Sequence, residues 1–273
     1  MDKEIFLINQ LHSEYIGDDG AVIGEMVYSM DAFHEDVHFK RAWMTPRQIA
    51  RKAMLINLSD AIAMNAAPLY ALVTLSIPKD ISQDEIRELT QSLESTAGEF
   101  GCEIIGGDTI GGDKLHISIT IISKSKDPLL RKGLQEGDLL AYTGTLGKSK
   151  RDLDRLLSGE KIADDSGFYE PKLRREFIIK SRAYLRAGMD ISDGLYCDAN
   201  KILACNSLGF EPVTDISDEA GMSGEEYEML VGISPENLER VMEVARETET
   251  PLTVFAKVAE NKRRYSNCRS HHF

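Results

Sequence analysis

The sequence predicts an α/β protein built from two domains, a class that here includes α+β arrangements. The chain has 273 residues, which suits two domains of ordinary size, and 42% of them are hydrophobic, which suffices to bury a core. Apolar runs of strand length alternate with segments whose apolar residues recur at helical spacing. A charged stretch at 124–127, followed by Pro128, interrupts the chain near its middle. We therefore expect domains at residues 1–125 and 126–273.

Two helices in the first half are indicated by a start signal and by spacing. Thr45 is an N-cap residue followed by Pro46 in the first turn, and Ile86, Leu89 and Leu93 recur at helical spacing. Runs rich in β-branched residues, bounded by glycine and proline, are typical of strands. We expect strands at 20–31, 71–77, 102–109 and 115–122, and helices at 45–63 and 82–100.

The second half continues the alternation of strands and helices. LLAYTGTLG opens it as a strand, and a glycine- and acid-containing stretch after residue 157 indicates a loop. YEMLVGI and PLTVFAKV indicate strands on either side of a helix. We expect strands at 139–147, 227–233 and 251–258, helices at 148–157, 172–186, 193–207 and 235–247, and a loop at 158–171.

The charge balance excludes one class of function. The chain has 32 Lys and Arg residues against 45 Asp and Glu residues, which gives a formal net charge of -13. Proteins that bind nucleic acid or anionic membranes do so through an excess of basic charge. We therefore expect neither partner, and we interpret most of the acidic residues as solvated surface.

The chain start and the cysteines indicate a cytoplasmic protein. The opening MDKEIFLINQL has charges of both signs and no apolar run long enough for a signal peptide or a membrane span. Cys102, Cys197, Cys205 and Cys268 show no CxxC or zinc-knuckle spacing. We expect all four to be reduced thiols.

Acidic residues recur where expected strands end and tight glycine turns begin. An isolated pair such as Asp18 and Asp19 is usually a solvated turn, but repeated occurrence at strand ends favours a site. Carboxylates that converge repel one another unless cations neutralise them, and ligand sets made only of oxygen select hard divalent ions such as Mg²⁺. The pattern predicts magnesium ions and a polyphosphate. The acids at these positions are Asp19, Asp31, Asp60, Asp108, Asp190 and Asp193.

Two glycine-rich segments allow backbone N–H groups to approach phosphate. GGDTIGG at 106–112 is one, and GTLGKS at 144–149 is the other. The second is not a P-loop, because Tyr142 stands where the first glycine of GxxxxGK[ST] is required. No GxGxxG follows a strand, so a dinucleotide-binding domain is not indicated.

Other candidate side chains have a structural interpretation beside the functional one. Arg131 could clamp a phosphate or face solvent, and His38 could bind a ligand or serve as a structural histidine. Glu225, Glu226 and Glu228 could form a solvated strand edge or a binding surface.

Nine sequence motifs occur in a fixed order between residues 16 and 232. They are IGDDGAVI, SMD, VHF, NLSDAIAMNAAP, IIGGDT, LLRKG, EGDLLAYTGTLG, MDISDGL and SGEEYEML. This ordered set resembles the thiamine-monophosphate kinase family, and the NLSD, GGDT and DISDG trio resembles the wider aminoimidazole-ribotide synthetase superfamily.

The resemblance implies an N-terminal sheet domain that forms a barrel with its mate in a homodimer. It also implies a C-terminal mixed α/β domain and an ATP cleft between the two domains. The implied activity is transfer of the γ-phosphoryl group of ATP to thiamine monophosphate, assisted by several magnesium ions. The product would be thiamine diphosphate, and the reaction would be the last step of its biosynthesis.

Site residues are carried over by matching motif. The resemblance implies that magnesium is held by Asp19, Asp31, Asp60, Asp108, Asp190 and Asp193, assisted by Ser29 and the backbone of Met30. It implies that ATP is contacted by Gly107, Asp108, Arg131 and Ser192, and that Asp193, Asp108 and Arg131 act in catalysis. His38, Glu225 and Glu226 would face the thiamine group.

The chain departs from the family pattern at several positions. Met30 replaces a usual threonine, Asn65 a glycine, and Glu226 and Lys148 each an aspartate. Ser270 stands where an aromatic residue would pack on the thiamine ring.

Two other functions stay open at this point. The chain could be another ATP-using member of the superfamily, such as a ribotide cyclo-ligase. No catalytic cysteine lies near the N-terminus, which argues against a selenide substrate. The other alternative is a non-catalytic dimer that binds nucleotide and metal.

Overall fold

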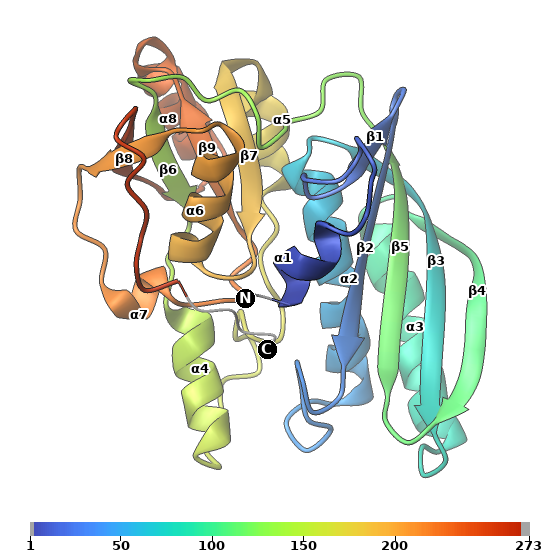
Figure 1. Ribbon diagram of the computed structural model, residues 1–273. Coiled ribbons are helices and arrows are strands. Elements are labelled where there is room, and N and C mark those ends of the chain that lie inside the picture. The colour runs from blue at the N-terminus through green and yellow to red at the C-terminus, as the bar shows by residue number, and fades with distance from the viewer. Residues whose placement is uncertain (1–2, 269–273) are drawn as a thin grey trace.

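The computed structural model describes residues 3–268 as a mixed α/β protein with two five-stranded sheets (Figure 1). The strand order is β1-β2-β5-β3-β4 in the first sheet and β7-β9-β6-β10-β8 in the second. The first part comprises α1 (Lys3–Ile8), β1 (Ala21–Ile23), β2 (Met26–His34), α2 (Pro46–Ala63), β3 (Ala67–Pro78), α3 (Gln83–Glu99), β4 (Glu103–Gly112) and β5 (His116–Lys124).

The second sheet and its helices follow along the chain. They comprise β6 (Leu139–Thr143), α4 (Lys148–Leu157), α5 (Arg175–Ser181), β7 (Leu185–Ile191), α6 (Leu195–Cys205), β8 (Gly209–Pro212), α7 (Asp218–Gly221), β9 (Glu228–Ile233), α8 (Leu238–Glu247) and β10 (Leu252–Ala259). Short 3-10 helices lie at Arg182–Tyr184 and Pro235–Asn237. No helix within residues 3–268 is long and apolar enough to cross a membrane.

Helix α2 lies between the two sheets and connects their cores (Figure 1). It begins as predicted, because the Thr45 hydroxyl accepts from the Gln48 N–H and the Gln48 side chain accepts from the Thr45 N–H. Ile49 belongs to the core under the first sheet, whereas Ala63 belongs to a core under the second. The side chains that α2 directs to either side are therefore fixed by both halves of the protein.

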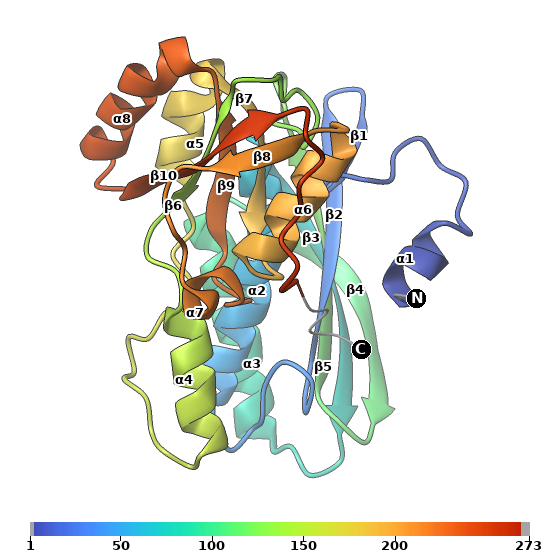
Figure 2. The same cartoon turned by 60° about the vertical axis from the view of Figure 1, so that its left-hand side comes forward.

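The first sheet has one face covered by helices and one face open. Helices α2 and α3 pack on the same side of the sheet, as Figure 2 shows. Cross-strand register aligns Asp31 of β2 with Ile119, Val73 and Gly107 in a row across the sheet. Alternating residues point to the opposite face. Exposed apolar side chains on that open face are Tyr28, Met30, Tyr70, Leu72 and Ile110.

The expected elements at 20–31 and 172–186 differ from those observed. The first is a hairpin of β1 and β2, whose turn passes through Gly24 at φ +63, a conformation that favours glycine. In the second, α5 ends at Ser181 and β7 begins at Leu185. Strand β7 is buried along almost its whole length, so it lacks the alternation that identifies a half-exposed strand.

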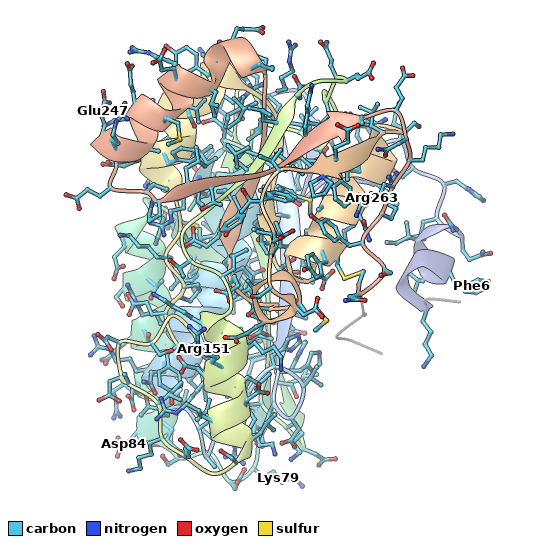
Figure 3. The ribbon with its side chains drawn as sticks, turned by 90° about the vertical axis from the view of Figure 1, so that its left-hand side faces the viewer. Phe6, Lys79, Asp84, Arg151, Glu247 and Arg263 are labelled. Carbon is cyan, nitrogen blue, oxygen red and sulfur yellow. A yellow bond between two sulfur atoms is a disulfide. The ribbon has the colours of Figure 1, made fainter. Side chains whose placement is uncertain are left out.

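The expectation of four reduced thiols is wrong for two of the cysteines. Cys197 on α6 and Cys268 form a disulfide, which appears as a yellow bond in Figure 3, whereas Cys102 and Cys205 are free. The two bonded residues lie 71 positions apart. Motif spacing detects only cysteines that are close in sequence, so it could not reveal a pair that the fold brings together.

Candidate functional site

A small cavity between the two sheets collects most of the predicted acidic residues. Its volume is about 230 Å³. The contributing elements are the loop before β1, strand β2, helix α2, the segment between β5 and β6, the end of β7 with the loop that follows it, helix α6 and the segment before β9. Its charged lining comprises Asp18, Asp19, Asp31, Asp60, Asp190, Asp193, Glu225, Arg131 and Lys201. The predicted convergence of carboxylates from distant motifs is therefore observed for five of the six aspartates.

The carboxylates of this cavity are electrostatically crowded. Burial, followed by neighbouring carboxylates, raises the pKa of Asp60 and of Asp190 well above the ordinary value. The Ser59 hydroxyl donates to Asp190 Oδ2 over 2.6 Å, which partly offsets this effect. Burial also raises the pKa of Asp18 to about 6. Additional positive charge would therefore relieve repulsion here.

Arg131 provides part of this positive charge at one end of the cavity. Its Nε and Nη2 atoms donate to Asp19 Oδ1 over 3.0 and 2.5 Å, and its backbone N–H donates to the carboxylate of Asp18. The arginine side chain is 20% exposed, so it can still meet a ligand. Arg131, which was expected to contact ATP, lies in the lining of this cavity.

Two buried oxygen atoms fit a metal ion. Asp19 Oδ2 and Ser29 Oγ are buried and have no hydrogen-bond partner. Ser29 and Asp31 lie two residues apart on β2 and so face the same side, whereas Met30, a residue that is 62% exposed, faces the other. Within residues 3–268, no group of three or more histidine, cysteine or acidic residues is arranged to hold a metal by itself.

A larger cavity of about 810 Å³ adjoins the first. The two share His38, Ser192, Asp193 and Glu225 in their linings. Aromatic side chains of the larger cavity are Phe39, Trp43, Phe168 and Tyr196. A ring-containing molecule can therefore lie in the larger cavity while a charged group attached to it reaches the carboxylates.

Glu225 is positioned at the junction of the two cavities by a buried lysine. Lys52 on α2 is fully buried, and its Nζ lies 2.7 Å from Glu225 Oε2 and 4.0 Å from the centre of the Phe168 ring. Glu225 has a φ of 55, and its N–H donates to the Ser192 carbonyl over 2.7 Å. A positive φ is unfavourable for a non-glycine residue, so the surrounding contacts hold this segment in place.

Glu226 lies away from both cavities, unlike Glu225. Its Oε1 accepts from the N–H groups of Gly147 and Ser149 over 2.7 and 3.2 Å, and from Ser223 Oγ over 2.6 Å. Glu226 therefore caps the N-terminus of α4, whose own N-cap residue Gly147 has no side chain to do so. The residue expected to face the substrate serves in this structure to fix a helix.

Gly107 and Asp108 also lie outside the cavity that contains Asp31. Both are on β4, at the edge of the first sheet. Gly107 is in the register row of Asp31 but three strands away, a distance of about 14 Å. Asp108 is one residue further, so its side chain points to the opposite face. One chain therefore cannot place Asp31 and Asp108 on the same metal ion.

Lys201 and Asp198 of α6 belong to the site but were not predicted from the sequence. Lys201 pairs with Asp193 and, over 3.1 Å, with Asp198. Asp198 Oδ2 accepts from the Asp193 N–H over 3.0 Å. The sequence signal was the helical spacing of three residues between Asp198 and Lys201, directly after MDISDGL.

Comparison with known proteins shows which family this chain is similar to. Residues 17–124 match the family described as AIR synthase related protein, N-terminal domain. The thiamine-monophosphate kinase of Rhodopirellula baltica is 30% identical over 274 residues, which cover 89% of this chain and 82% of that protein. The thiamine-monophosphate kinase of Aquifex aeolicus is 29% identical over 230 residues, covering 80% and 75%.

The fold comparison agrees with the sequence comparison. The solved structure of AaThiL complexed with AMPPCP and TMP matches with a TM-score of 0.84 at 25% identity, covering 96% of this chain and 94% of that one. The hydrogenase maturation protein HypE of E. coli shares the fold alone, with a TM-score of 0.72 at 18% identity. Because the match to the Rhodopirellula protein extends over most of both sequences, this chain belongs to the thiamine-monophosphate kinase family.

Proposed function

We propose that the protein transfers the γ-phosphoryl group of ATP to thiamine monophosphate and so forms thiamine diphosphate. The observation that carries this proposal is the contact between the two cavities at His38, Ser192, Asp193 and Glu225. A nucleoside triphosphate fits the smaller, carboxylate-lined cavity through bound cations. A phosphate monoester that carries an aromatic ring fits the larger cavity. Their phosphates then meet where Asp193 lies. Family membership supports the same reaction.

The reaction requires charge neutralisation and alignment rather than a general base. The second pKa of a phosphate monoester is about 6, so the acceptor oxygen is already largely deprotonated at neutral pH. An oxygen of the acceptor phosphate forms a bond to the γ-phosphorus, the bond from that phosphorus to the β,γ-bridging oxygen breaks, and ADP leaves. Two anionic phosphates must approach each other, so positive charge is needed between them. A site rich in aspartate meets this need because the carboxylates can hold metal cations.

The residues of the smaller cavity divide into metal and nucleotide ligands in this proposal. Magnesium held in this cavity would supply positive charge that offsets the charge of the phosphates. The carboxylates of Asp19, Asp31, Asp60, Asp190 and Asp193 would hold it, with Ser29 Oγ and the Met30 carbonyl. Arg131 and Ser192 would contact the phosphates of ATP. Arg131 can form paired hydrogen bonds to phosphate oxygens because its guanidinium presents parallel donors.

Substrate recognition is proposed for the larger cavity. The thiazolium ring of thiamine is a cation, so the carboxylate of Glu225 and the face of an aromatic ring both suit it. His38 lines both cavities and stacks with Phe33 at a centroid distance of 5.6 Å. It can therefore contact the monophosphate from a fixed position.

We further propose a homodimer in which the open face of the first sheet packs against its mate. This face exposes Tyr28, Met30 and Leu72, which would be unusual on a monomer surface. A barrel made from two such sheets could bring Gly107 and Asp108 of a second copy to the metal site. That arrangement would reconcile the placement of Asp108, three strands from Asp31, with a role in ATP binding.

The proposed function is tested by offering purified protein and Mg·ATP three acceptors in turn. These are thiamine monophosphate, thiamine and formylglycinamidine ribotide, and product mass identifies the reaction. We expect thiamine diphosphate from the first alone, and Asp193→Asn should lower its formation by at least about 10²-fold while circular dichroism is unchanged. A product from the ribotide would favour a cyclo-ligase. Nucleotide binding without any product would favour a sensor.

A further inference from the structure

Lys201 brings a fixed positive charge into the smaller cavity. It lies on α6, its side chain is 37% exposed, and its Nζ forms ion pairs with Asp193 and Asp198. Arg131 is the other Lys or Arg residue of that lining, at the end occupied by Asp18 and Asp19. The two basic side chains therefore stand at different carboxylates, with Asp60 and Asp190 elsewhere in the same lining.

Asp198 anchors both Lys201 and the backbone of Asp193. The Asp198 side chain is fully buried, its Oδ1 lies 3.1 Å from Lys201 Nζ, and its Oδ2 accepts from the Asp193 N–H. A buried carboxylate with two such partners is costly to disturb. Lys201 is consequently held against Asp193 by a contact that does not depend on any ligand, which distinguishes it from a flexible surface lysine.

The ion pair between Lys201 and Asp193 lies where the two cavities meet. Asp193 lines both cavities, so Lys201 places positive charge at the point where the two phosphates would meet. A carboxylate already paired with an ammonium group attracts a divalent ion less strongly, because the two cations repel each other at such distances. The cavity lining holds seven carboxylates and only these two Lys or Arg side chains, so further cations are needed elsewhere in it.

We infer that Lys201 supplies at Asp193 a positive charge that a magnesium ion would otherwise supply, and that it stabilises the phosphoryl group during transfer. This inference rests on the proposed function. Of the five carboxylates proposed above to hold magnesium, Asp193 is then neutralised by Lys201, whose ammonium group also faces the phosphates. Asp19, Asp31, Asp60 and Asp190 are left as the principal metal ligands. The enzyme would then bind one metal ion fewer than a variant that lacks the lysine.

The test counts bound Mn²⁺ in place of Mg²⁺. Wild-type protein, Lys201→Gln and Lys201→Arg are titrated with Mn²⁺ in the presence of the non-hydrolysable analogue AMPPCP, and free Mn²⁺ is measured by electron paramagnetic resonance. We expect Lys201→Gln to bind one additional Mn²⁺ per chain and Lys201→Arg to keep the wild-type number. Lys124→Gln is the matched control, because it removes a lysine from an exposed ion pair with Glu25.

Kinetics supply the second measurement. At limiting Mg²⁺, Lys201→Gln should lower turnover about 10²-fold, and a large excess of Mg²⁺ should restore part of the loss as a metal replaces the ammonium group. An unchanged Mn²⁺ number together with an unchanged Mg²⁺ dependence would overturn the inference. Because the Mn²⁺ count needs no acceptor, it still decides the role of Lys201 if the protein makes no thiamine diphosphate.

A double variant covers the case in which Lys201→Gln fails to fold. Lys201→Gln combined with Asp198→Asn removes the buried carboxylate together with its cation, so no buried charge is left unpaired. The amide oxygen that Asp198→Asn introduces can still accept from the Asp193 N–H. The same additional Mn²⁺ is expected, and the wild-type number would contradict the inference.

Discussion

At the scale of single residues, burial in the acidic cavity disfavours the charged form of Asp18. The pKa of Asp18 is raised to about 6, chiefly by burial, while an unfolded aspartate titrates near 3.9. Between these pH values the folded protein binds more protons at this group than the unfolded chain does. The contribution of Asp18 to stability therefore falls as pH rises from about 4 to about 6, and it stays low above that.

Because the stability contribution of Asp18 falls as pH rises, we can predict the behaviour of Asp18→Asn in the absence of divalent ions. The amide can still accept from the Arg131 N–H but has no charge to bury. The melting temperature of the variant relative to wild type should increase from pH 4 to pH 7. Differential scanning calorimetry in EDTA measures it. A difference that is constant across this range would contradict the raised pKa, and saturating Mg·AMPPCP should diminish the advantage of the variant.

Another residue-scale feature is the backbone conformation of Asn65, which was noted above as a departure from the motif. Asn65 adopts a φ of 52, and its side-chain amide donates to the Asp127 carbonyl over 3.0 Å. Asparagine tolerates this region better than most residues because its short polar side chain can bond locally. Asn65 can therefore hold a backbone conformation that usually favours glycine, at the turn from α2 into β3.

At the scale of elements, local signals identified helices better than strands. The starts of α2 and α3 follow from Thr45 and Ser82, whose hydroxyls each accept from the N–H three residues on. Strand β7 was missed because it is buried on both faces, and that burial comes from packing against α2 and α6, which sequence does not display. Helix α4 was predicted, but its cap Glu226 comes from 79 residues further along the chain.

The capping role of Glu226 yields a prediction at this scale. Glu226→Ala removes the acceptor from two N–H groups at the start of α4, which costs about 1 kcal/mol, or roughly 2–4 °C in melting temperature. Glu226→Gln keeps an acceptor oxygen and should lose less. In both variants the KM for thiamine monophosphate should stay within about twofold of wild type. A KM raised tenfold with unchanged stability would instead place Glu226 at the substrate.

At the scale of the whole molecule, β4 lies at the edge of the first sheet, which separates Asp108 from the other predicted metal ligands. Asp31 and Asp108 lie three strands apart and on opposite faces of the first sheet. A site that uses both needs two copies of the chain, and the open apolar face of the sheet offers a surface on which they could pack. The proposed active site would then be shared between subunits.

Subunit mixing tests this arrangement. Asp31→Asn and Asp108→Asn should each be inactive alone, but co-expressed chains with different tags should regain activity. In a random mixture half of the dimers are mixed and one of their two sites is intact, so about one quarter of wild-type activity is expected. If both aspartates acted within one chain, the mixture would contain no intact site and would stay inactive.

The α/β class, the capped helices and the acidic residues that line the cavity all follow from the order of amino acids. They do so because caps, periodicity and motifs are local properties of the chain. Other features required the folded molecule: Glu225 and not Glu226 faces the cavity, Lys201 stands at Asp193, Cys197 meets Cys268, and Asp108 lies far from Asp31. Each of these depends on contacts between segments distant in sequence, and such contacts are set by packing of the two sheets around α2.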